Sequence, residues 1–276
     1  MVSGWQALGY TFDLSSSDPA SGAYYASLFT SLKACDETTA HFVVRPVASV
    51  SDDTYELVRD GEVWSKAATP VSFGTELVTE INAGAVGSWP GVVCHAGGVS
   101  HQGVGILLPA DPESGKSTLT CGLVRAGFRY LTDEGVAFHP GTTHIEPYPK
   151  PLALDKGSWF LFPELEPLAD LDSEDFERTQ WLVPPTAIRS DAVGGPCDAR
   201  YIVFPKYVES AETVLTPIGR AEALVELAKN TFEFNQHSRE YLDQLAIVVA
   251  ACDCYRLTVG TLADAVACIQ ELVGVE

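Results

Sequence analysis

The stretch from Ala110 to Thr118 holds the residues of this chain that are best suited to chemistry. It reads Ala110-Asp111-Pro112-Glu113-Ser114-Gly115-Lys116-Ser117-Thr118 and has the spacing of a phosphate-binding loop, G-x-x-x-x-G-K-[ST]. In such a loop, backbone N–H groups and a helix N-terminus surround a phosphate, because both carry partial positive charge. Lys116 would contact the β- and γ-phosphate oxygens of ATP, and the hydroxyl of Ser117 would hold Mg²⁺.

The flanks of this stretch predict the structure that a phosphate-binding loop requires. An apolar run of strand length, 104–109, comes before it, and helical spacing of Leu119, Leu123 and Val124 comes after it. Strand, loop and helix therefore follow in the expected order. Two departures weaken the match. Alanine replaces the first glycine of the pattern, and two acids inside the loop would oppose a phosphate unless they point to solvent.

Two acids end the next predicted strand, 128–132. We expect this strand to run beside the loop strand, so that Asp133 faces the γ-phosphate. A carboxylate there could coordinate Mg²⁺ or take the proton of an attacking hydroxyl. Glu134 could instead activate water, because a strand that ends in Asp-Glu is also typical of NTPases. A solvated turn is the alternative for both acids.

His95 ends another predicted strand, 92–95, which we expect to pair antiparallel with 105–108. A single histidine on an apolar strand is usually a core residue with its hydrogen bonds satisfied. Beside a phosphate loop it could orient the γ-phosphate, or tune the carboxylate through its protonation near neutral pH.

Taken together, these residues resemble the HPr kinase/phosphorylase family, and more closely its diverged HPr-kinase-like relatives, which share a fold with phosphoenolpyruvate carboxykinase. The family has a histidine on a strand, then a phosphate loop, then an apolar strand that ends in two acids. The resemblance implies an α/β fold with a P-loop kinase core and a mixed sheet. It also implies ATP and Mg²⁺ as cofactors, Lys116 and Ser117 in the phosphate and magnesium roles, Asp133 as catalytic base, and His95 in the active site.

The relatives also carry lysines in a proline-rich segment after the acids. The segment 149–156 is similar, so Lys150 or Lys156 could contact phosphate or substrate, and a basic surface loop is the alternative. Family members are oligomeric, which makes a homo-oligomer one expectation. Members that act on HPr have a glycine at the position of Ala110, Glu at that of Thr118 and Asp at that of Glu134. They also carry a glycine-rich signature that this chain lacks. We therefore expect a different hydroxyl acceptor: most simply serine of a peptide or protein, or a small molecule.

The rest of the chain suggests two domains. Residues 1–88 predict a small α+β region with a hairpin at 41–66, turning at Asp60-Gly61, and a helix at 73–87. We expect this region to dock the substrate. Residues 89–276 form the expected catalytic domain, with a strand at 201–204 and, after it, three helices and one further strand.

Composition narrows the class of protein. The net charge is −20, from 37 acidic and 17 basic residues, which argues against nucleic acid and anionic membranes as partners. The seven scattered cysteines show no zinc-site spacing and fit a reducing cytosol. Because no signal peptide or membrane-spanning run is evident, we expect a cytoplasmic protein.

Three functions remain open on sequence alone. The first is an ATP-dependent kinase for a hydroxyl acceptor. The second is an NTPase that transfers phosphate to water. The third is a non-catalytic nucleotide-binding regulatory protein, which Ala110 and the acidic loop favour. The order of histidine, loop and acids places the kinase first.

Overall fold

The computed structural model describes residues 4–47, 54–111, 114–167 and 180–274, which form two compact units. The first unit comprises Met1–Ser88 and Lys150–Ala187, and the second comprises Trp89–Pro149 and Ile188–Glu276. The division after Ser88 coincides with the expected domain boundary. Residues 150–187, however, group with the first unit and not with the 89–276 domain that we expected. Within that unit, the side chain of Leu182 packs against Gly74.

The first unit is built on a six-stranded sheet with the strand order β3-β1-β2-β4-β5-β6. Strands β2 and β4 are parallel, and the other neighbours are antiparallel. Its elements are β1 (Gly4–Ala7), β2 (Tyr10–Ser16), α1 (Pro19–Leu28), β3 (Lys33–Cys35), β4 (Ala40–Pro46), β5 (Tyr55–Arg59), β6 (Glu62–Ala67) and α2 (Gly74–Ser88), followed later in the chain by β12 (Leu152–Asp155), α4 (Lys156–Trp159), the 3-10 turn η1 (Pro163–Leu165), β13 (Gln180–Val183) and, at the boundary, α5 (Pro185–Ile188).

The predicted hairpin and helix of this unit are confirmed. Asp60 and Gly61 have φ angles of 49° and 89°, the two left-handed residues that a tight hairpin turn between β5 and β6 needs. Helix α2 buries Leu77, Ile81 and Ala85, which recur at four-residue spacing along one face. Burial of that face accounts for its association with the sheet.

The second unit contains an eight-stranded mixed sheet, so the expected α/β class with a mixed sheet is confirmed. The strand order is β11-β10-β7-β8-β14-β16-β15, with β9 paired to β7. Because β11 also pairs with β14, the run of pairings from β11 to β14 closes on itself. Its elements are β7 (Val93–His101), β8 (Val104–Pro109), α3 (Lys116–Arg125), β9 (Arg129–Thr132), β10 (Gly135–Phe138), β11 (His144–Glu146), β14 (Cys197–Tyr207), β15 (Val214–Pro217), α6 (Arg220–Lys229), α7 (Ser238–Ala251), β16 (Asp253–Val259) and α8 (Leu262–Leu272).

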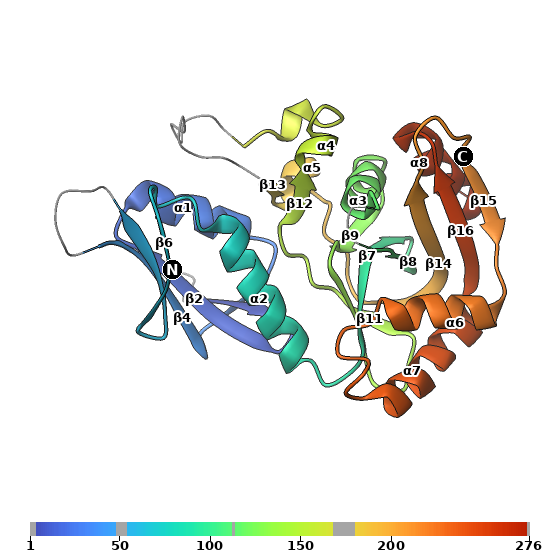
Figure 1. Cartoon of the computed structure of the whole chain (residues 1–276), viewed down its shortest axis with the longest axis horizontal. Coiled ribbons are helices and arrows are strands. Elements are labelled where there is room, and N and C mark those ends of the chain that lie inside the picture. Colours follow the sequence, from blue (N-terminus) through green and yellow to red (C-terminus); the bar gives the residue numbers. More distant parts are fainter. Residues whose placement is uncertain (1–3, 48–53, 112–113, 168–179, 275–276) are drawn as a thin grey trace. The chain divides into compact units, whose positions relative to one another are not determined.

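Helices cover this sheet from two directions. In the view of Figure 1, α3 and α8 lie toward the top of the unit, and α6 and α7 lie toward the bottom. The α6 and α7 side forms a core with the sheet, in which Leu227 and Val248 pack with Leu107 and Ile202. Burial of these aliphatic side chains is the main stabilising contribution to the unit.

One expectation about the strands is wrong. Strand β9, which leads to Asp133, pairs with β7 and not with the loop strand β8. Both edges of β8 are already occupied, by β7 and by the parallel strand β14. The chain passes from β9 to β10 along the other edge of β7, and the N–H of Ala96 donates to the carbonyl of Glu134 at 3.1 Å. On its opposite side Ala96 pairs with Pro109 at the end of β8, so the two acids still lie near the loop.

Candidate functional site

The loop between β8 and α3 turns through a left-handed glycine. Gly115 has φ 87° and is the N-cap of α3. A Cβ at this position would come no closer than 3.8 Å to another atom, so backbone conformation rather than space favours glycine. The loop is tied to the sheet, because the N–H of Tyr207 donates to the carbonyl of Ser114 at 3.4 Å. Of the nine loop residues named from sequence, Pro112 and Glu113 lie outside the described residues.

Lys116 and His95 meet directly. Lys116 is the first residue of α3 and only 7% exposed, and its Nζ lies within hydrogen-bond distance of His95 Nε2. Burial, and then the positive charge of Lys116, lower the pKa of His95 below its usual value. The imidazole is therefore neutral at neutral pH, and its Nε2 can accept a hydrogen from the ammonium group.

A glycine on β7 permits this approach. A Cβ on Gly97 would lie 2.5 Å from the hydroxyl oxygen of Thr120 and 3.4 Å from Cγ of Lys116. The missing side chain thus lets the first turn of α3 lie close against the strand that carries His95. The hydroxyl of Thr120 donates to the carbonyl of Lys116 at 2.9 Å and satisfies its own hydrogen-bonding need inside this contact.

The next residue of α3 faces the predicted catalytic carboxylate. The Ser117 hydroxyl donates to Oδ2 of Asp133 at 3.3 Å, and the hydroxyl of Tyr130 donates to Oδ1 at 3.0 Å. Asp133 is 1% exposed. Cis ligands of an octahedral Mg²⁺ lie ~2.9 Å apart, given metal–oxygen distances of about 2.0–2.1 Å. The oxygens of Ser117 and Asp133 therefore fit two positions of a magnesium ion after only a small adjustment.

Glu134 approaches the same imidazole nitrogen as Lys116. Its Oε1 is 3.6 Å from Nε2 of the imidazole, and its backbone is held in the turn because Thr132 Oγ1 accepts the N–H groups of Glu134 and Gly135, each at 3.2 Å. The imidazole thus has a lysine and a glutamate as neighbours. The two predicted acids differ in environment: Asp133 is buried, whereas the side chain of Glu134 is 33% exposed.

The segment that follows α6 contacts His95 through its backbone and through an aromatic ring. The N–H of His95 donates to the carbonyl of Asn230 at 2.6 Å, and the N–H of Phe232 donates to the carbonyl of Val93 at 3.0 Å. The ring of Phe232 stacks on the imidazole, with centroids 5.5 Å apart and planes at 29°. Sequence reasoning missed Phe232 and Tyr130, because no local pattern links an aromatic residue to an acid or a histidine on another element.

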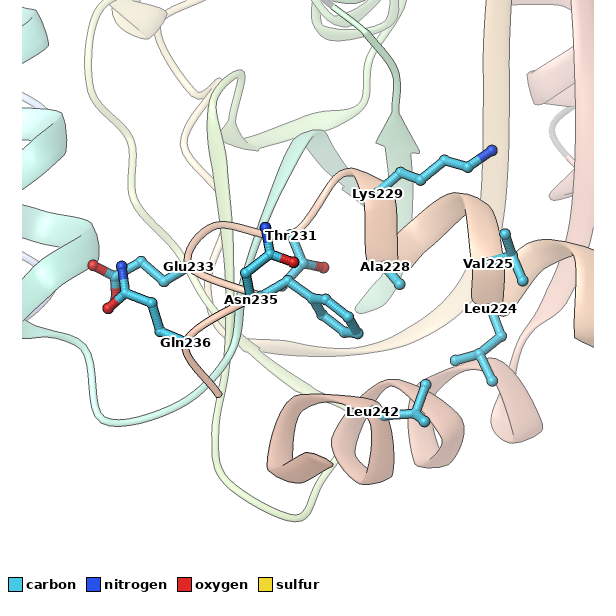
Figure 2. A pocket seen from close by; sticks show the side chains of 10 residues that line it. Leu224, Val225, Ala228, Lys229, Thr231, Glu233, Asn235, Gln236 and Leu242 are labelled. Carbon is cyan, nitrogen blue, oxygen red and sulfur yellow. The ribbon is translucent and has the colours of Figure 1, made fainter. Parts of the chain in front are cut away.

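A cavity of about 570 Å³ adjoins this segment, between α6 and α7 (Figure 2). Its walls combine aliphatic side chains of α6 and α7 with polar and aromatic side chains of the segment between these helices. They comprise Leu224, Val225, Ala228, Lys229, Thr231, Glu233, Phe234, Asn235, Gln236 and Leu242. None of the loop residues or predicted catalytic residues lines it. The cavity is adjacent to the loop site. Thr231, which lines the cavity, pairs with Cys94, the neighbour of His95 in sequence.

The two lysines predicted to contact phosphate or substrate belong to the first unit. Lys150 is 2% exposed, and its Nζ donates to the carbonyl of Pro151 at 3.0 Å. Lys156 is exposed and begins α4. A role for either lysine at the phosphate stays a prediction.

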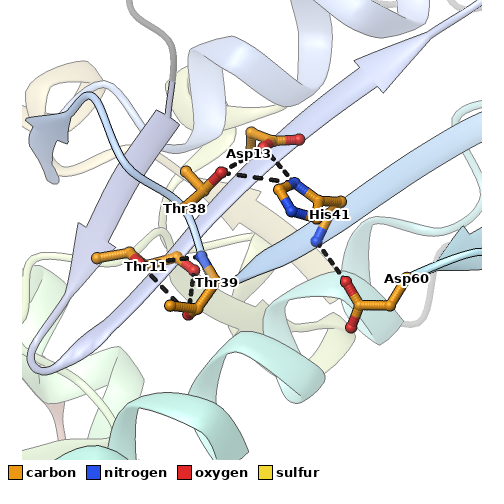
Figure 3. Close-up of polar contacts among 6 residues, drawn as sticks. All are labelled: Thr11, Asp13, Thr38, Thr39, His41 and Asp60. Atoms are coloured by element: carbon orange, nitrogen blue, oxygen red, sulfur yellow. Dashed lines mark hydrogen bonds and ion pairs between the residues drawn. The ribbon is translucent and has the colours of Figure 1, made fainter.

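The first unit contains a second group of polar side chains, on strands β2 and β4 (Figure 3). Asp13 and His41 stand opposite each other in the parallel register, and Oδ2 of Asp13 lies 2.7 Å from Nδ1 of His41. The Thr38 hydroxyl donates to the same oxygen at 2.5 Å, and Asp60 accepts the backbone N–H of His41 at 2.9 Å. The side chains of His41 and Asp13 are 57% and 30% exposed. We call Asp13, Thr38 and His41 the β2–β4 cluster.

Comparison with known proteins gives a distant likeness in structure and none in sequence. No protein-family model matches the chain, and no curated protein sequence matches it. Among solved structures it is similar to the HPr(Ser) kinase/phosphatase from Coxiella burnetii, with a TM-score of 0.36 and 11% sequence identity, over 66% of this chain and 87% of that chain. This likeness is to the family that the motifs resemble.

None of the helices in the described part of the chain is long and apolar enough to cross a membrane.

Proposed function

We propose that the protein is an ATP-dependent kinase that transfers the γ-phosphate of ATP to a hydroxyl group. One observation carries the proposal. A lysine and a serine open the helix that follows a strand, and the serine hydroxyl contacts a buried carboxylate, Asp133. A cation, a hydroxyl and a carboxylate at a helix N-terminus are the groups that phosphoryl transfer needs for binding and charge stabilisation.

Each residue has a separate role in this proposal. Lys116 binds the β- and γ-phosphate oxygens, assisted by the N-terminal N–H groups of α3. His95, neutral because its pKa is lowered, lies against the lysine and orients its ammonium group. Bound Mg²⁺ would be held by Ser117 and Asp133 and would offset the negative charge of the phosphate oxygens.

Asp133 is assigned as the base. The acceptor hydroxyl loses its proton to the carboxylate while its oxygen forms a bond to the γ-phosphorus. The bond from that phosphorus to the bridging oxygen breaks, and ADP leaves with the electron pair. The burial of Asp133 supports this role, because a base in a site shielded from water loses less of its effect to solvation.

An NTPase is the competing function, and the position of Glu134 favours it. Its carboxylate is partly exposed and lies beside His95, where it could orient a water molecule. Labelled γ-phosphate distinguishes the two functions when ATP is supplied with a mixture of serine-containing peptides and small polyols. Kinase activity places label on an acceptor and is lost in Asp133→Asn. Label found only as free phosphate, abolished by Glu134→Gln but not by Asp133→Asn, would overturn the kinase assignment.

The acceptor class is a hydroxyl on a peptide, protein or small molecule, and the first unit is proposed to dock it. In the part of the chain that the structure describes, strand β6 is the last strand of its sheet and carries two half-exposed apolar side chains, Val63 and Trp64. An unpaired edge of this kind can bind an extended peptide through main-chain hydrogen bonds. Trp64→Ser should raise the KM for a peptide acceptor and leave the KM for ATP unchanged. An unchanged KM for the peptide would remove the docking role of this edge.

A further inference from the structure

Asp133 is buried, and a separate hydroxyl contacts each of its two carboxylate oxygens. Ser117 approaches Oδ2 and Tyr130 approaches Oδ1, at 3.3 and 3.0 Å. Ser117 lies in the phosphate-binding loop motif, whereas Tyr130 matches no motif and lies three residues before the carboxylate that it contacts. The proposed mechanism does not use Tyr130.

The backbone of Tyr130 is fixed from the side opposite β7. Its N–H donates to the carbonyl of Ala192 at 2.7 Å, and its carbonyl accepts the N–H of Gly194 at 2.8 Å. On the other edge it pairs with Val99 of β7. Its side chain is 0% exposed. A tyrosine side chain has only two rotatable bonds, so the phenol oxygen is held in one place.

The hydroxyl can act only as a donor toward the carboxylate. An ionised carboxylate has no proton to donate, so the contact of 3.0 Å between the phenol oxygen and Oδ1 of Asp133 uses the phenol proton. The phenol therefore keeps its proton, and its hydrogen bond ends on a charged oxygen, which makes the bond stronger than one between neutral groups. A hydrogen bond of this kind fixes the orientation of the carboxylate. Because both oxygens are bonded to the same carbon, holding Oδ1 also determines where Oδ2 lies.

We propose that Tyr130 is a positioning residue for phosphoryl transfer: by holding Oδ1 of Asp133, it directs Oδ2 toward Ser117 and the reacting phosphate. This role rests on the proposed function. Phenylalanine would fill the same volume as Tyr130, so packing alone does not require the hydroxyl. The hydroxyl is required where the direction of the carboxylate matters.

The test is a double-mutant cycle between Tyr130→Phe and Asp133→Asn, measured as turnover of Mg-ATP with water as the acceptor. Tyr130→Phe should lower kcat by ~10–10²-fold, since a misplaced catalytic group costs up to about that much, and leave the KM for ATP within about twofold. In the Asp133→Asn background, Tyr130→Phe should change kcat by no more than about twofold. Effects that multiply in the double variant would assign Tyr130 a structural role and overturn the proposal.

Two controls make the outcome decisive. Tyr25→Phe removes another buried phenol, whose hydroxyl donates to the carbonyl of Pro70 at 2.6 Å, and it should leave kcat unchanged. If Tyr130→Phe alone does not fold, recovery of folding in the Tyr130→Phe, Asp133→Asn double variant would still show that the hydroxyl acts through the carboxylate. Failure to recover would contradict it.

The failures of the two proposals can be told apart. If the parent protein turns over Mg-ATP neither with water nor with a hydroxyl acceptor, the proposed function is wrong, and this role is lost with it. If the parent is active and Asp133→Asn is not, but Tyr130→Phe matches the parent, only the positioning role is wrong.

Discussion

The loop site and the β2–β4 cluster contain the same kinds of side chain but in different surroundings. Each contains a histidine, an aspartate and a hydroxyl: His41, Asp13 and Thr38 in the cluster, and His95, Asp133 and Ser117 in the loop site, where the acid that contacts the histidine is Glu134. Asp133 is 1% exposed, whereas the Asp13 side chain is 30% exposed. Only the loop site adds a lysine at the start of a helix.

Residue types alone therefore do not define a reactive site. Interactions between exposed charges are weakened by water and salt, so an exposed ion pair contributes about 1 kcal/mol or less. At a buried carboxylate the same interactions are stronger, and each lost partner costs more. We therefore assign the β2–β4 cluster to stabilising the parallel pairing of two strands, and the loop site to chemistry.

The largest expected effect comes from neutralising the buried carboxylate. Asp133→Asn keeps the shape of the side chain and removes the base, so kcat for phosphoryl transfer should fall by ~10²–10⁴-fold while Mg-ATP still binds. Asp13→Asn is the matched change in the β2–β4 cluster and should leave kcat unchanged. Steady-state kinetics and calorimetry on both variants check this. A similar loss of kcat in the two variants would mean that burial of the aspartate does not distinguish the loop site from the β2–β4 cluster in function.

A smaller effect is expected from the left-handed glycine of the loop. Gly115→Ala places a Cβ at φ 87° and should lower the free energy of unfolding by about 1–2 kcal/mol. Gly141→Ala is the matched control, with φ 71° and open space around its Cβ, and should cost a similar amount. Only Gly115→Ala should also weaken Mg-ATP binding. Urea denaturation measures the free energy of unfolding, and calorimetry measures the affinity for Mg-ATP. Equal ATP affinity in both variants would show that Gly115 has no role in phosphate binding.

Much of the loop site was predictable because its parts are local in sequence. The glycine and lysine that open α3, the antiparallel pair β7–β8 and the acids after β9 all follow from short patterns. The partner of β9 was not predictable, since strand neighbours depend on which edges other strands leave open. Here β14, far along the chain, occupies the second edge of β8.

The same reason explains the residues that the sequence did not reveal. Phe232 reaches His95 from a segment that follows α6 in the chain and pairs with β7. Residues 150–187 join the first unit through tertiary contacts such as that of Leu182 with Gly74, which leave no mark in composition. Local patterns thus identified the chemical groups, and non-local packing determined which aromatic side chains support them.

The smallest expected effect is a pH dependence of stability from His95. Its pKa is lowered in the folded protein from the usual 6.5, so the unfolded chain takes up its proton at higher pH than the folded protein does. The contribution of His95 to the free energy of unfolding should therefore be constant above pH 6.5 and should fall as the pH drops below it. Urea midpoints at about pH 7.5 and about pH 5.5 should differ more in the parent than in His95→Gln. An identical difference in both would contradict the assigned environment of His95.

The account depends most on phosphate binding at Lys116, and calorimetric titration of Mg-ATP into Lys116→Ala tests it directly. Loss of the buried cation should weaken binding by ~10²-fold or more, as expected when one partner of a buried charge pair is removed. Lys229→Ala, a change at a 62% exposed side chain of the same unit, should bind as the parent does. Parent-like affinity in Lys116→Ala, with the fold intact by circular dichroism, would contradict the phosphate-binding role of this loop.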